Sequence, residues 1–437
     1  MQTKHGAKNM ERMEEHVPDF NYQNVQNSIS SSPWDYRPLM DEIAIRASGL
    51  LEGGRRCRLV IDDTGFQKKG HNSVGVARQY LGRLGKIENG QVAVCSSLAC
   101  GQRSTLVDMR LYLPEAWTTD PKRCHKAHVP ESEMVYRPKT DLALVSVSHL
   151  RSIGVGFDIV SADSGYGSQP SFLHGLDDLG ETFVAEQHCN AQVWPEQPWH
   201  HREPKSGKAK PLKHPQPSSP KVRIDEWIKA QPDLAWQRLK VRDSDQGWVE
   251  VSYLAKRVWV MDEASEEEKC WWLLAWENPD EERSQDKFGN VLGPRRHYAL
   301  SNAGIDMDVR QLVADGVERN VVERNFREAK SELGMSDYQI RGWTAWHHHM
   351  SLVMLAMLFT MQEKMHHDPP DNTPALTTGD ILFMLERLLP QRGFGPADPE
   401  EIKRMLQLRI RKRYLDQFRR KNRTKVERPP LAEDERI

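Results

Sequence analysis

Two short apolar segments that lie far apart in the chain each end in an aspartate. Residues 59–61 run into Asp62, and residues 159–162 run into Asp163. Short apolar runs bounded by turn-forming residues are typical of central strands that are buried on both faces. The sequence therefore predicts two core strands whose ends each hold a carboxylate. The simpler alternative is that each aspartate only forms a turn.

A third acid, Glu323, lies in a segment with helical periodicity. At about 100° per residue, Arg319, Glu323 and Lys330 share one face of the predicted helix. Glu328 and Glu332 point to the other side. The helical phase therefore selects Glu323 as the acid that faces the same way as the two basic residues. The alternative is an ordinary solvated helix face with ion pairs between neighbouring turns.

Three carboxylates from separate elements are the ligands that a divalent metal site needs. Magnesium prefers carboxylate oxygens and keeps several waters, so one or two carboxylates per ion are enough. Two ions roughly 3.5–4 Å apart activate an attacking oxygen and stabilise the leaving one. Asp62, Asp163 and Glu323 therefore predict a phosphodiester enzyme with two Mg²⁺ ions, for which Mn²⁺ is a substitute.

The most specific stretch of the sequence runs from Ile61 to Gly70 and reads Ile-Asp-Asp-Thr-Gly-Phe-Gln-Lys-Lys-Gly. With this stretch the chain resembles the DDE transposases of bacterial insertion sequences, most closely the insertion-sequence seven-oh-one group, which is related to the insertion-sequence-four superfamily. The resemblance covers nearly the whole chain. Further matching segments are residues 8–15, 27–35, 73–80, 85–89, 162–167 and 342–349.

The resemblance implies an α/β fold with an RNase H-like catalytic core and a triad of two aspartates and a glutamate that holds two metal ions. The three acids fall on Asp62, Asp163 and Glu323. Asp63 is the alternative first acid, and only one of the pair can be a ligand because neighbours in a strand point to opposite faces. In the wider superfamily a tyrosine precedes the Arg-Glu-Lys set, and Gly316 stands at that position.

The resemblance also implies DNA as the partner, both the inverted repeats at the transposon ends and the target. We expect Arg319 and Lys330 to contact DNA near the scissile phosphate, and Lys68 and Lys69 to contact its backbone. Two ends must be joined, so a homodimer is expected in the synaptic complex.

Length and charge are compatible with this interpretation. The chain has 437 residues and a net charge of −1, which excludes a uniformly basic nucleic-acid binder. Basic residues instead gather at 202–222 and 404–425. No apolar run is long enough to span a membrane and no secretory signal is visible, so we expect a cytoplasmic protein. The six cysteines have irregular spacing, which favours reduced thiols over disulfides or a zinc site.

We expect five regions along the chain. A β-rich insertion divides the core, because about 160 residues between the second and third acids are too many for a simple connection. The first region resembles the end of an N-terminal DNA-binding domain, and we expect the chain to start inside that domain. The expected ranges are 1–54 (helical remnant of the N-terminal domain), 55–170 (first part of the core), 171–310 (insertion, with a mobile basic loop at 204–221), 311–365 (second part of the core) and 366–437 (basic helical C-terminal region).

Local patterns predict several individual elements. Helices are expected over residues 38–51, 352–361 and 381–389. Strands are expected over 74–80 and 91–98, and the insertion is expected to hold antiparallel strands at 248–251, 257–260 and 271–274. The tryptophans of the insertion either pack in its core or stack on bases, and core packing is the preferred interpretation. The run His347–His349 is expected to be structural or to touch phosphate, since adjacent helical residues diverge too far to share one ion.

The sequence as a whole predicts a cut-and-paste DNA transposase. One alternative is a remnant that no longer transposes and that binds transposon ends and represses intact copies. Another is an RNase H-like repair or resolving nuclease.

Overall fold

The structure is a computed structural model. It describes residues 21–53, 56–101, 103–201, 216–244, 247–262, 267–278, 295–367 and 376–389, together with Lys403, Leu406, Gln407, Ile410 and Tyr414. Most of the expected loop at 204–221 lies outside these residues, as do residues 8–15 and nearly all of the basic C-terminal segment.

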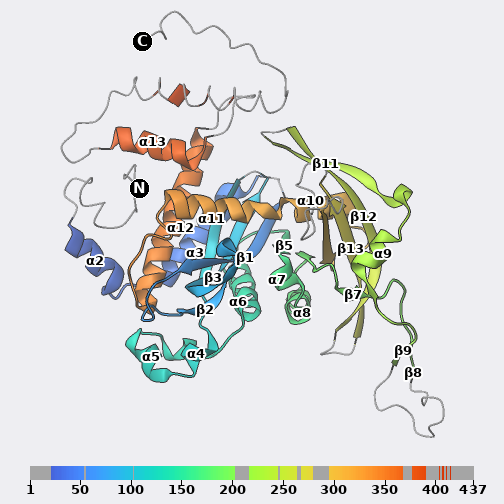
Figure 1. The fold of residues 1–437 in the computed structure, drawn as a ribbon. Coiled ribbons are helices and arrows are strands. Elements are labelled where there is room, and N and C mark those ends of the chain that lie inside the picture. Colours follow the sequence, from blue (N-terminus) through green and yellow to red (C-terminus); the bar gives the residue numbers. More distant parts are fainter. Residues whose placement is uncertain are drawn as a thin grey trace, which may run out of the picture.

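One large mixed sheet forms the centre of the molecule (Figure 1). Four strands with antiparallel pairing come first in the chain, and the two that follow run parallel to the first of them. Their order across the sheet is β4-β3-β1-β5-β6, and the short β2 pairs with the other end of β3. The predicted α/β class is thereby confirmed. The bounds are β1 Cys57–Gln67, β2 Ala77–Leu81, β3 Lys86–Cys100, β4 Arg103–Leu111, β5 Ile159–Ala162 and β6 Phe183–Glu186.

The strands of the expected insertion continue the same sheet. They are antiparallel to one another, and β14 pairs with β6 of the core through Ala299 with Glu186 and Leu300 with Ala185. The insertion is therefore joined to the core by main-chain hydrogen bonds. Its strands are β7 Gln192–Val193, β8 His200–His201, β9 Gln216–Pro217, β10 Val222–Arg223, β11 Gln237–Ser244, β12 Gly247–Asp262, β13 Glu267–Glu277 and β14 Arg296–Ser301.

Helices cover both faces of the core. On one face α6 and α3 lie together, since His149 of α6 is 2.8 Å from Asp41 of α3. On the other face α11 packs against β3 and β4, where Asn325 bonds to Ser97 and Ser104. The bounds are α2 Tyr22–Ser30, α3 Tyr36–Leu51, α4 Glu115–Thr118, α5 Pro121–Lys126, α6 Lys139–Ser152, α7 Ser164–Gly167, α8 Pro170–Asp178, α9 Ile224–Lys229, α10 Val309–Val317, α11 Val321–Glu332, α12 Trp343–His366 and α13 Thr378–Leu388.

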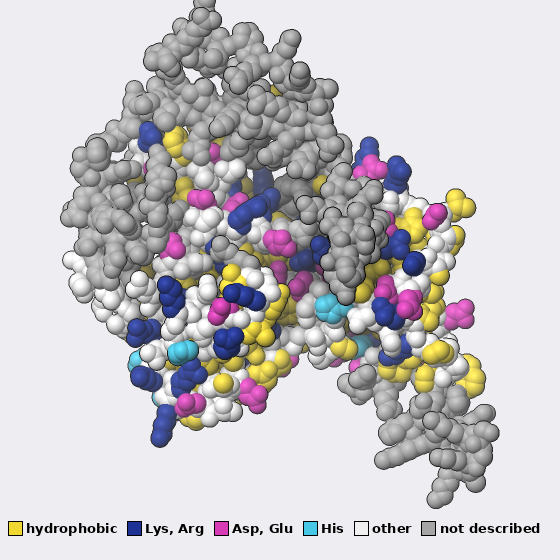
Figure 2. Space-filling view, viewed as in Figure 1, with side chains coloured by type: hydrophobic (Ala, Val, Ile, Leu, Met, Phe, Trp, Pro, Cys, Tyr) yellow, Lys and Arg dark blue, Asp and Glu magenta, His cyan; other side chains and the backbone are white. Residues whose placement is uncertain are grey.

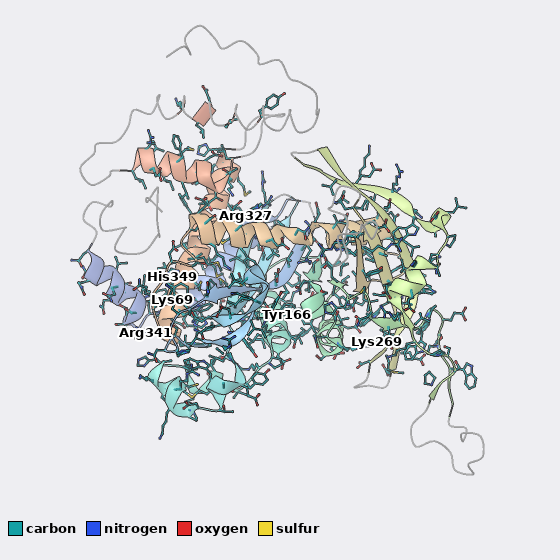
Figure 3. All side chains as sticks on the ribbon, viewed as in Figure 1. Lys69, Tyr166, Lys269, Arg327, Arg341 and His349 are labelled. Atoms are coloured by element: carbon teal, nitrogen blue, oxygen red, sulfur yellow. A yellow bond between two sulfur atoms is a disulfide. The ribbon has the colours of Figure 1, made fainter. Side chains whose placement is uncertain are left out.

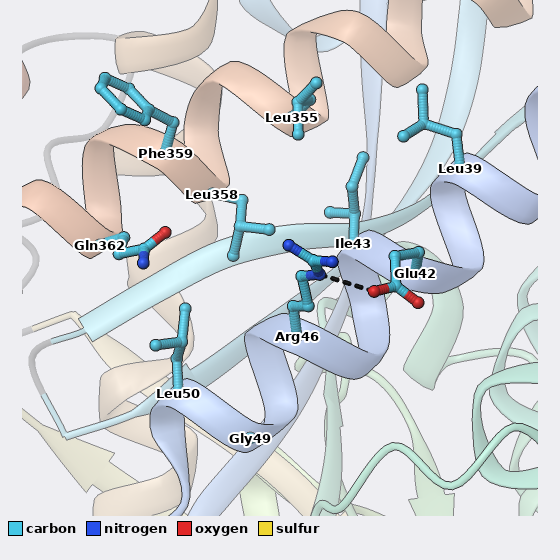
Figure 4. A pocket seen from close by; sticks show the side chains of 10 residues that line it. All are labelled: Leu39, Glu42, Ile43, Arg46, Gly49, Leu50, Leu355, Leu358, Phe359 and Gln362. Atoms are coloured by element: carbon cyan, nitrogen blue, oxygen red, sulfur yellow. Dashed lines mark hydrogen bonds and ion pairs between the residues drawn. The ribbon is translucent and has the colours of Figure 1, made fainter.

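The α3 helix belongs to the core, although it was expected in a separate N-terminal region. Met40, Ile43, Ala44 and Ala47 are buried in the main hydrophobic cluster, and Arg37 forms a 2.8 Å ion pair with the buried Asp108 of β4. An apolar groove of about 610 Å³ runs between α3 and α12 (Figure 4). The Glu42–Arg46 ion pair lies at its edge.

Several predicted elements differ from the observed ones. The first core strand does not stop at Asp62 but runs on to Gln67, because hydrogen bonding with β3 continues through both aspartates. The predicted strand at 74–80 covers 77–81 instead. Two predicted insertion strands are a single one, β12, since the intervening Tyr253 and Leu254 are buried and continue its pairing.

The prediction that every cysteine is reduced is wrong for one pair. Cys57 and Cys100 face each other in the register of β1 and β3 and form a disulfide, with their Cα atoms 4.3 Å apart. Spacing along the chain gives no sign of a pair that only the strand register brings together. In the described part of the chain, no helix is long and apolar enough to cross a membrane.

Candidate active site

Asp62 and Asp163 lie next to each other at the centre of the sheet. Their preceding residues, Ile61 and Ala162, are register partners in the parallel pair β1 and β5, and adjacent strands are about 4.8 Å apart. Burial and, after it, the Asp163 carboxylate raise the pKa of Asp62 to about 8. Two carboxylates held together in a partly buried position repel each other, and a bound cation would relieve this repulsion.

Asp163 also has a local structural role. It follows β5 directly and is the N-cap of α7, where its Oδ1 accepts hydrogen bonds from the amides of Gly165 and Tyr166 at 3.0 and 3.2 Å. An added Cβ at Gly167 would lie 2.1 Å from the Glu186 carbonyl oxygen, so α7 sits directly against β6. Asp163 therefore forms a turn through its Oδ1 atom, and this does not conflict with its predicted role as a metal ligand.

Asp63 points away from this pair. Its carboxylate forms a 2.6 Å ion pair with Lys139 at the start of α6, on the face of the sheet opposite α11. As expected for neighbours in a strand, Asp62 and Asp63 serve different faces. The geometry places Asp62, and not Asp63, on the side of Arg319.

Arg319 forms ion pairs with carboxylates of two strands, β1 and β6. Its side chain is only 10% exposed and lies 3.1 Å from Glu186 and 3.8 Å from Asp62. Although burial disfavours its charge, the carboxylates of Glu186, Asp62 and Asp163 hold the pKa of Arg319 above its ordinary value. Arg319, which is predicted to contact DNA, therefore forms its ion pairs with the acids of the candidate site.

Glu186 is the site residue that the sequence analysis did not single out. It ends the apolar run Phe183–Glu186, which forms β6 beside β5. The same signal that selected Asp62 and Asp163, an apolar run ending in an acid, is present here. This run falls within the range expected for the insertion, 171–310, and its position beside β5 becomes visible only in the sheet pairing.

Glu323 is exposed on α11, and its distance from the aspartates has to be judged from its neighbours on the helix. Arg319, in the short 3-10 turn Glu318–Asn320 that precedes α11, contacts Asp62. Lys330, about 10 Å after Glu323 along α11, donates a 2.9 Å hydrogen bond to the Gly65 carbonyl of β1. Glu323 thus lies in the first turn of α11, between two residues that contact β1.

The other predicted DNA contacts differ in their accessibility. The Lys68 ammonium lies 3.3 Å from the centroid of the Tyr338 ring, and burial lowers its pKa to about 8. Lys330 donates a hydrogen bond to the Gly65 carbonyl of β1. Lys69 is exposed (Figure 3). Of the four predicted cations, Lys69 is the one whose side chain faces solvent.

The donor set fits a divalent cation only in part. Among the described residues, no group of three or more His, Cys, Asp or Glu side chains is placed to hold a metal ion. Asp62 and Asp163 alone provide the adjacent hard oxygen ligands that Mg²⁺ prefers. Burial of Asp62 and, after it, the nearby Asp163 carboxylate raise the pKa of Asp62, and a cation between the two carboxylates would offset both effects.

The missing tyrosine of the superfamily pattern has a structural counterpart. A Cβ at Gly316 would lie 2.9 Å from the indole of Trp276, which comes from β13. Trp276 is buried and stacks on His297 with the ring centroids 5.5 Å apart. The space beside Gly316 is therefore filled by an aromatic ring from the insertion.

The tryptophans and the histidine run are mainly structural. Trp194, Trp271 and Trp276 are buried, whereas Trp199 is 64% exposed. His347 and His348 are buried on α12, which begins four residues before this run, and His348 is hydrogen-bonded to the carbonyl oxygens of Ile29 and Trp34. The predicted structural role of the histidines is confirmed for these two.

The mixed sheet thus brings together the carboxylates of Asp62 in β1, Asp163 directly after β5 and Glu186 at the end of β6. The family model of the DDE superfamily endonucleases matches residues 1–247, more than half of the chain, and the chain belongs to this family. Members of this superfamily depend on divalent metal ions, and the family implies an RNase H-like core. The matched range holds Asp62, Asp163 and Glu186, while α11 lies beyond it.

A curated relative is similar over part of the sequence. The probable transposase for insertion sequence element IS701 from Microchaete diplosiphon is 33% identical over 177 residues, which are 40% of this chain and 42% of that protein. The match therefore spans less than half the length of the relative.

Proposed function

We propose that the chain is a DNA transposase that hydrolyses a phosphodiester at the ends of an insertion sequence and then joins the freed 3′-hydroxyl to target DNA. The observation that carries this proposal is the adjacent pair Asp62 and Asp163 on neighbouring strands of the sheet, where burial and, after it, the Asp163 carboxylate raise the pKa of Asp62. Family membership and the similarity to a transposase support it. The protein would act on DNA in the cytoplasm, as a dimer that holds two ends.

Asp62 and Asp163 would hold Mg²⁺, with Mn²⁺ as a substitute, and Glu323 is proposed as the third ligand. The bound ions supply activation of the attacking oxygen and charge for the leaving oxygen. Asp163 is kept in place by the hydrogen bonds that cap α7. Asp62 is kept in place by the rigid pairing of β1 with β3 and β5.

Arg319 and Glu186 are proposed to position Asp62. The guanidinium is shared between the carboxylates of two strands, so it sets the direction of the Asp62 side chain and offsets part of the negative charge of the site. Lys330 fixes α11 over β1 through the Gly65 carbonyl and thereby fixes the face on which Glu323 lies.

Cleavage of labelled transposon-end DNA in Mg²⁺ tests the proposal. Asp62→Asn, Asp163→Asn and Glu323→Gln should each lower the cleavage rate by more than about a hundred-fold, because each removes a ligand charge. The matched control is Asp63→Asn, which removes a carboxylate one residue away on the opposite face and should keep most of the activity.

Different outcomes separate the alternatives. If Asp63→Asn abolishes cleavage and Asp62→Asn does not, the first acid is Asp63. If Glu323→Gln cuts normally, Glu323 is not a ligand. Wild type that binds transposon ends without cutting them under any metal would support the remnant that represses intact copies.

A further inference from the structure

The helix α5 and two segments packed against it form a surface rich in basic residues. Residues 121–128 read Pro-Lys-Arg-Cys-His-Lys-Ala-His and contain no acid. Figure 2 shows Lys, Arg and His side chains gathered over this part of the molecule. Lys69, His71 and Arg341 belong to the adjoining segments and are exposed. We call these residues the α5 surface.

Hydrogen bonds hold the three segments of the α5 surface together. The guanidinium of Arg123 donates to the His71 carbonyl at 2.9 Å and to the Val76 carbonyl at 3.3 Å. The amide of Val74 donates to the Arg341 carbonyl, and the amide of Trp343 donates to the Ala127 carbonyl, at 2.9 and 2.8 Å. The cations are thus carried by a fixed framework.

The short helix is itself anchored to the core. Arg123 stacks on the ring of Trp117 at 3.8 Å, and the buried Cys124 thiol donates to the Trp117 carbonyl. Asp120 caps the helix by accepting from the Arg123 amide. Arg123 therefore has a structural role, and the surrounding lysines are the groups left to meet a partner.

Several cations of the α5 surface form no ion pair within the part of the chain that the structure describes. Four of its basic residues take part in no ion pair with a described residue: Lys69, Lys122, Lys126 and Arg341. A fixed group of uncompensated cations attracts a polyanion and releases its counter-ions on binding.

The lack of apolar side chains on the α5 surface favours nucleic acid over an acidic protein as the partner. None of the large exposed hydrophobic residues in the described part of the chain belongs to residues 68–71, 121–128 or 341. Protein interfaces have an apolar centre, whereas phosphate backbones are bound mainly by Lys, Arg and backbone amides.

We propose that the α5 surface binds the phosphate backbone of a DNA duplex, outside the site of cleavage and without reading its sequence. This inference rests on the proposed function for the choice of DNA as the polyanion. Strand β1 leads from Asp62 toward Lys69, which is at most roughly 23 Å further along an extended chain. That distance corresponds to about seven base pairs, so one duplex can reach both places.

Binding of a fluorescent duplex of unrelated sequence, measured in EDTA over a range of salt, tests the inference without any cleavage. Lys122→Ala with Lys126→Ala should lower the slope of log Kobs against log salt by about 1.8, since each phosphate contact contributes about 0.9. The dissociation constant should rise roughly ten-fold or more at moderate salt. Lys122→Arg with Lys126→Arg should retain wild-type binding.

The matched control is Lys229→Ala with Lys256→Ala, which removes two exposed lysines of the insertion. An unchanged slope in the α5 variant, an equal loss in the control, or a wild type that prefers single-stranded RNA or an acidic protein to the duplex would each overturn the inference.

The same variants separate this inference from the proposed function. Asp62→Asn should keep the wild-type salt slope for the unrelated duplex in EDTA and should fail to cut labelled transposon-end DNA in Mg²⁺. If wild type does not cut and the α5 variant still loses duplex binding, the transposase proposal fails and the binding surface stands. If cutting depends on Asp62 and the α5 variant binds normally, the transposase proposal stands and the binding surface falls.

Discussion

The space beside the Cα atom of Gly316 has room for one large side chain, and the indole of Trp276 fills it. The glycine is buried on α10, and the indole from β13 occupies the space where a side chain at 316 would project. A tyrosine at 316 and the tryptophan at 276 therefore exclude each other. The superfamily pattern predicts an aromatic side chain at position 316 of α10, whereas here the aromatic ring beside this position comes from Trp276 of β13.

Gly316→Tyr should destabilise the fold by at least about 2 kcal/mol through overpacking, and Trp276→Ala by about 3–5 kcal/mol through the cavity it leaves. In the double variant the tyrosine enters that cavity, so the combined loss should be clearly smaller than the sum. Urea unfolding of all four proteins in a double-mutant cycle measures the coupling. Additive losses would show that the two side chains do not compete for space.

Among the individual residues, the sequence accounts for the relative placement of some side chains of the candidate site and not of others, while their roles stay predictions. The neighbourhood of Asp62 and Asp163 follows from two apolar runs that pair in parallel, and the opposite direction of Asp63 follows from strand alternation. The contact of Arg319 with Glu186 could not be predicted, because it depends on how α10 and β6 pack. Whether Glu323 is a metal ligand stays a prediction.

The helix α12 buries two histidines that have to stay neutral. Burial lowers the pKa of His347 to about 3 and that of His349 to about 4. In the unfolded chain both bind a proton below about pH 6.5. Their contribution to stability is therefore complete above about pH 6.5 and is lost as the pH falls toward their folded pKa values.

Each of these histidines should steepen the loss of unfolding free energy by up to about 1.4 kcal/mol per pH unit in this window. Urea unfolding at pH 7.5 and pH 5, for wild type and for His347→Gln, isolates one contribution, since all other titrating groups are shared. The difference between wild type and the variant should shrink at the lower pH. A difference that does not change with pH would mean that His347 is not kept neutral in the fold.

Elements with a clear local period were predicted well. Helices α3 and α13 lie within a few residues of their expected ranges, because a repeated apolar face marks them along the sequence. The joining of β14 to β6 left no local sign, since it pairs residues more than a hundred positions apart. The disulfide between β1 and β3, whose cysteines are 43 residues apart, also left no local sign.

For the whole molecule, metal binding at the proposed Asp62–Asp163 site would be coupled to folding. A cation that binds the folded state alone should raise the unfolding free energy by about 2.7 kcal/mol when present at a hundred times its dissociation constant. The sign with pH follows from Asp62, whose pKa is about 8 without an ion. Below that pH a proton competes with the cation, so the stabilisation should grow from pH 6.5 to pH 8.5.

Thermal unfolding with MgCl₂ or MnCl₂, against EDTA, measures this effect. Asp63→Asn should keep the stabilisation and Asp62→Asn should lose it. Equal stabilisation of all three proteins would mean that the ions bind elsewhere.

The main-chain pairing of β14 with β6 connects the expected insertion to the candidate active site. Glu186 is one of the two residues of β6 that pair with β14, and its side chain holds Arg319 beside Asp62. A displacement of β14 would therefore move the main chain of Glu186 and, through the ion pairs of Arg319, change the surroundings of the Asp62 carboxylate.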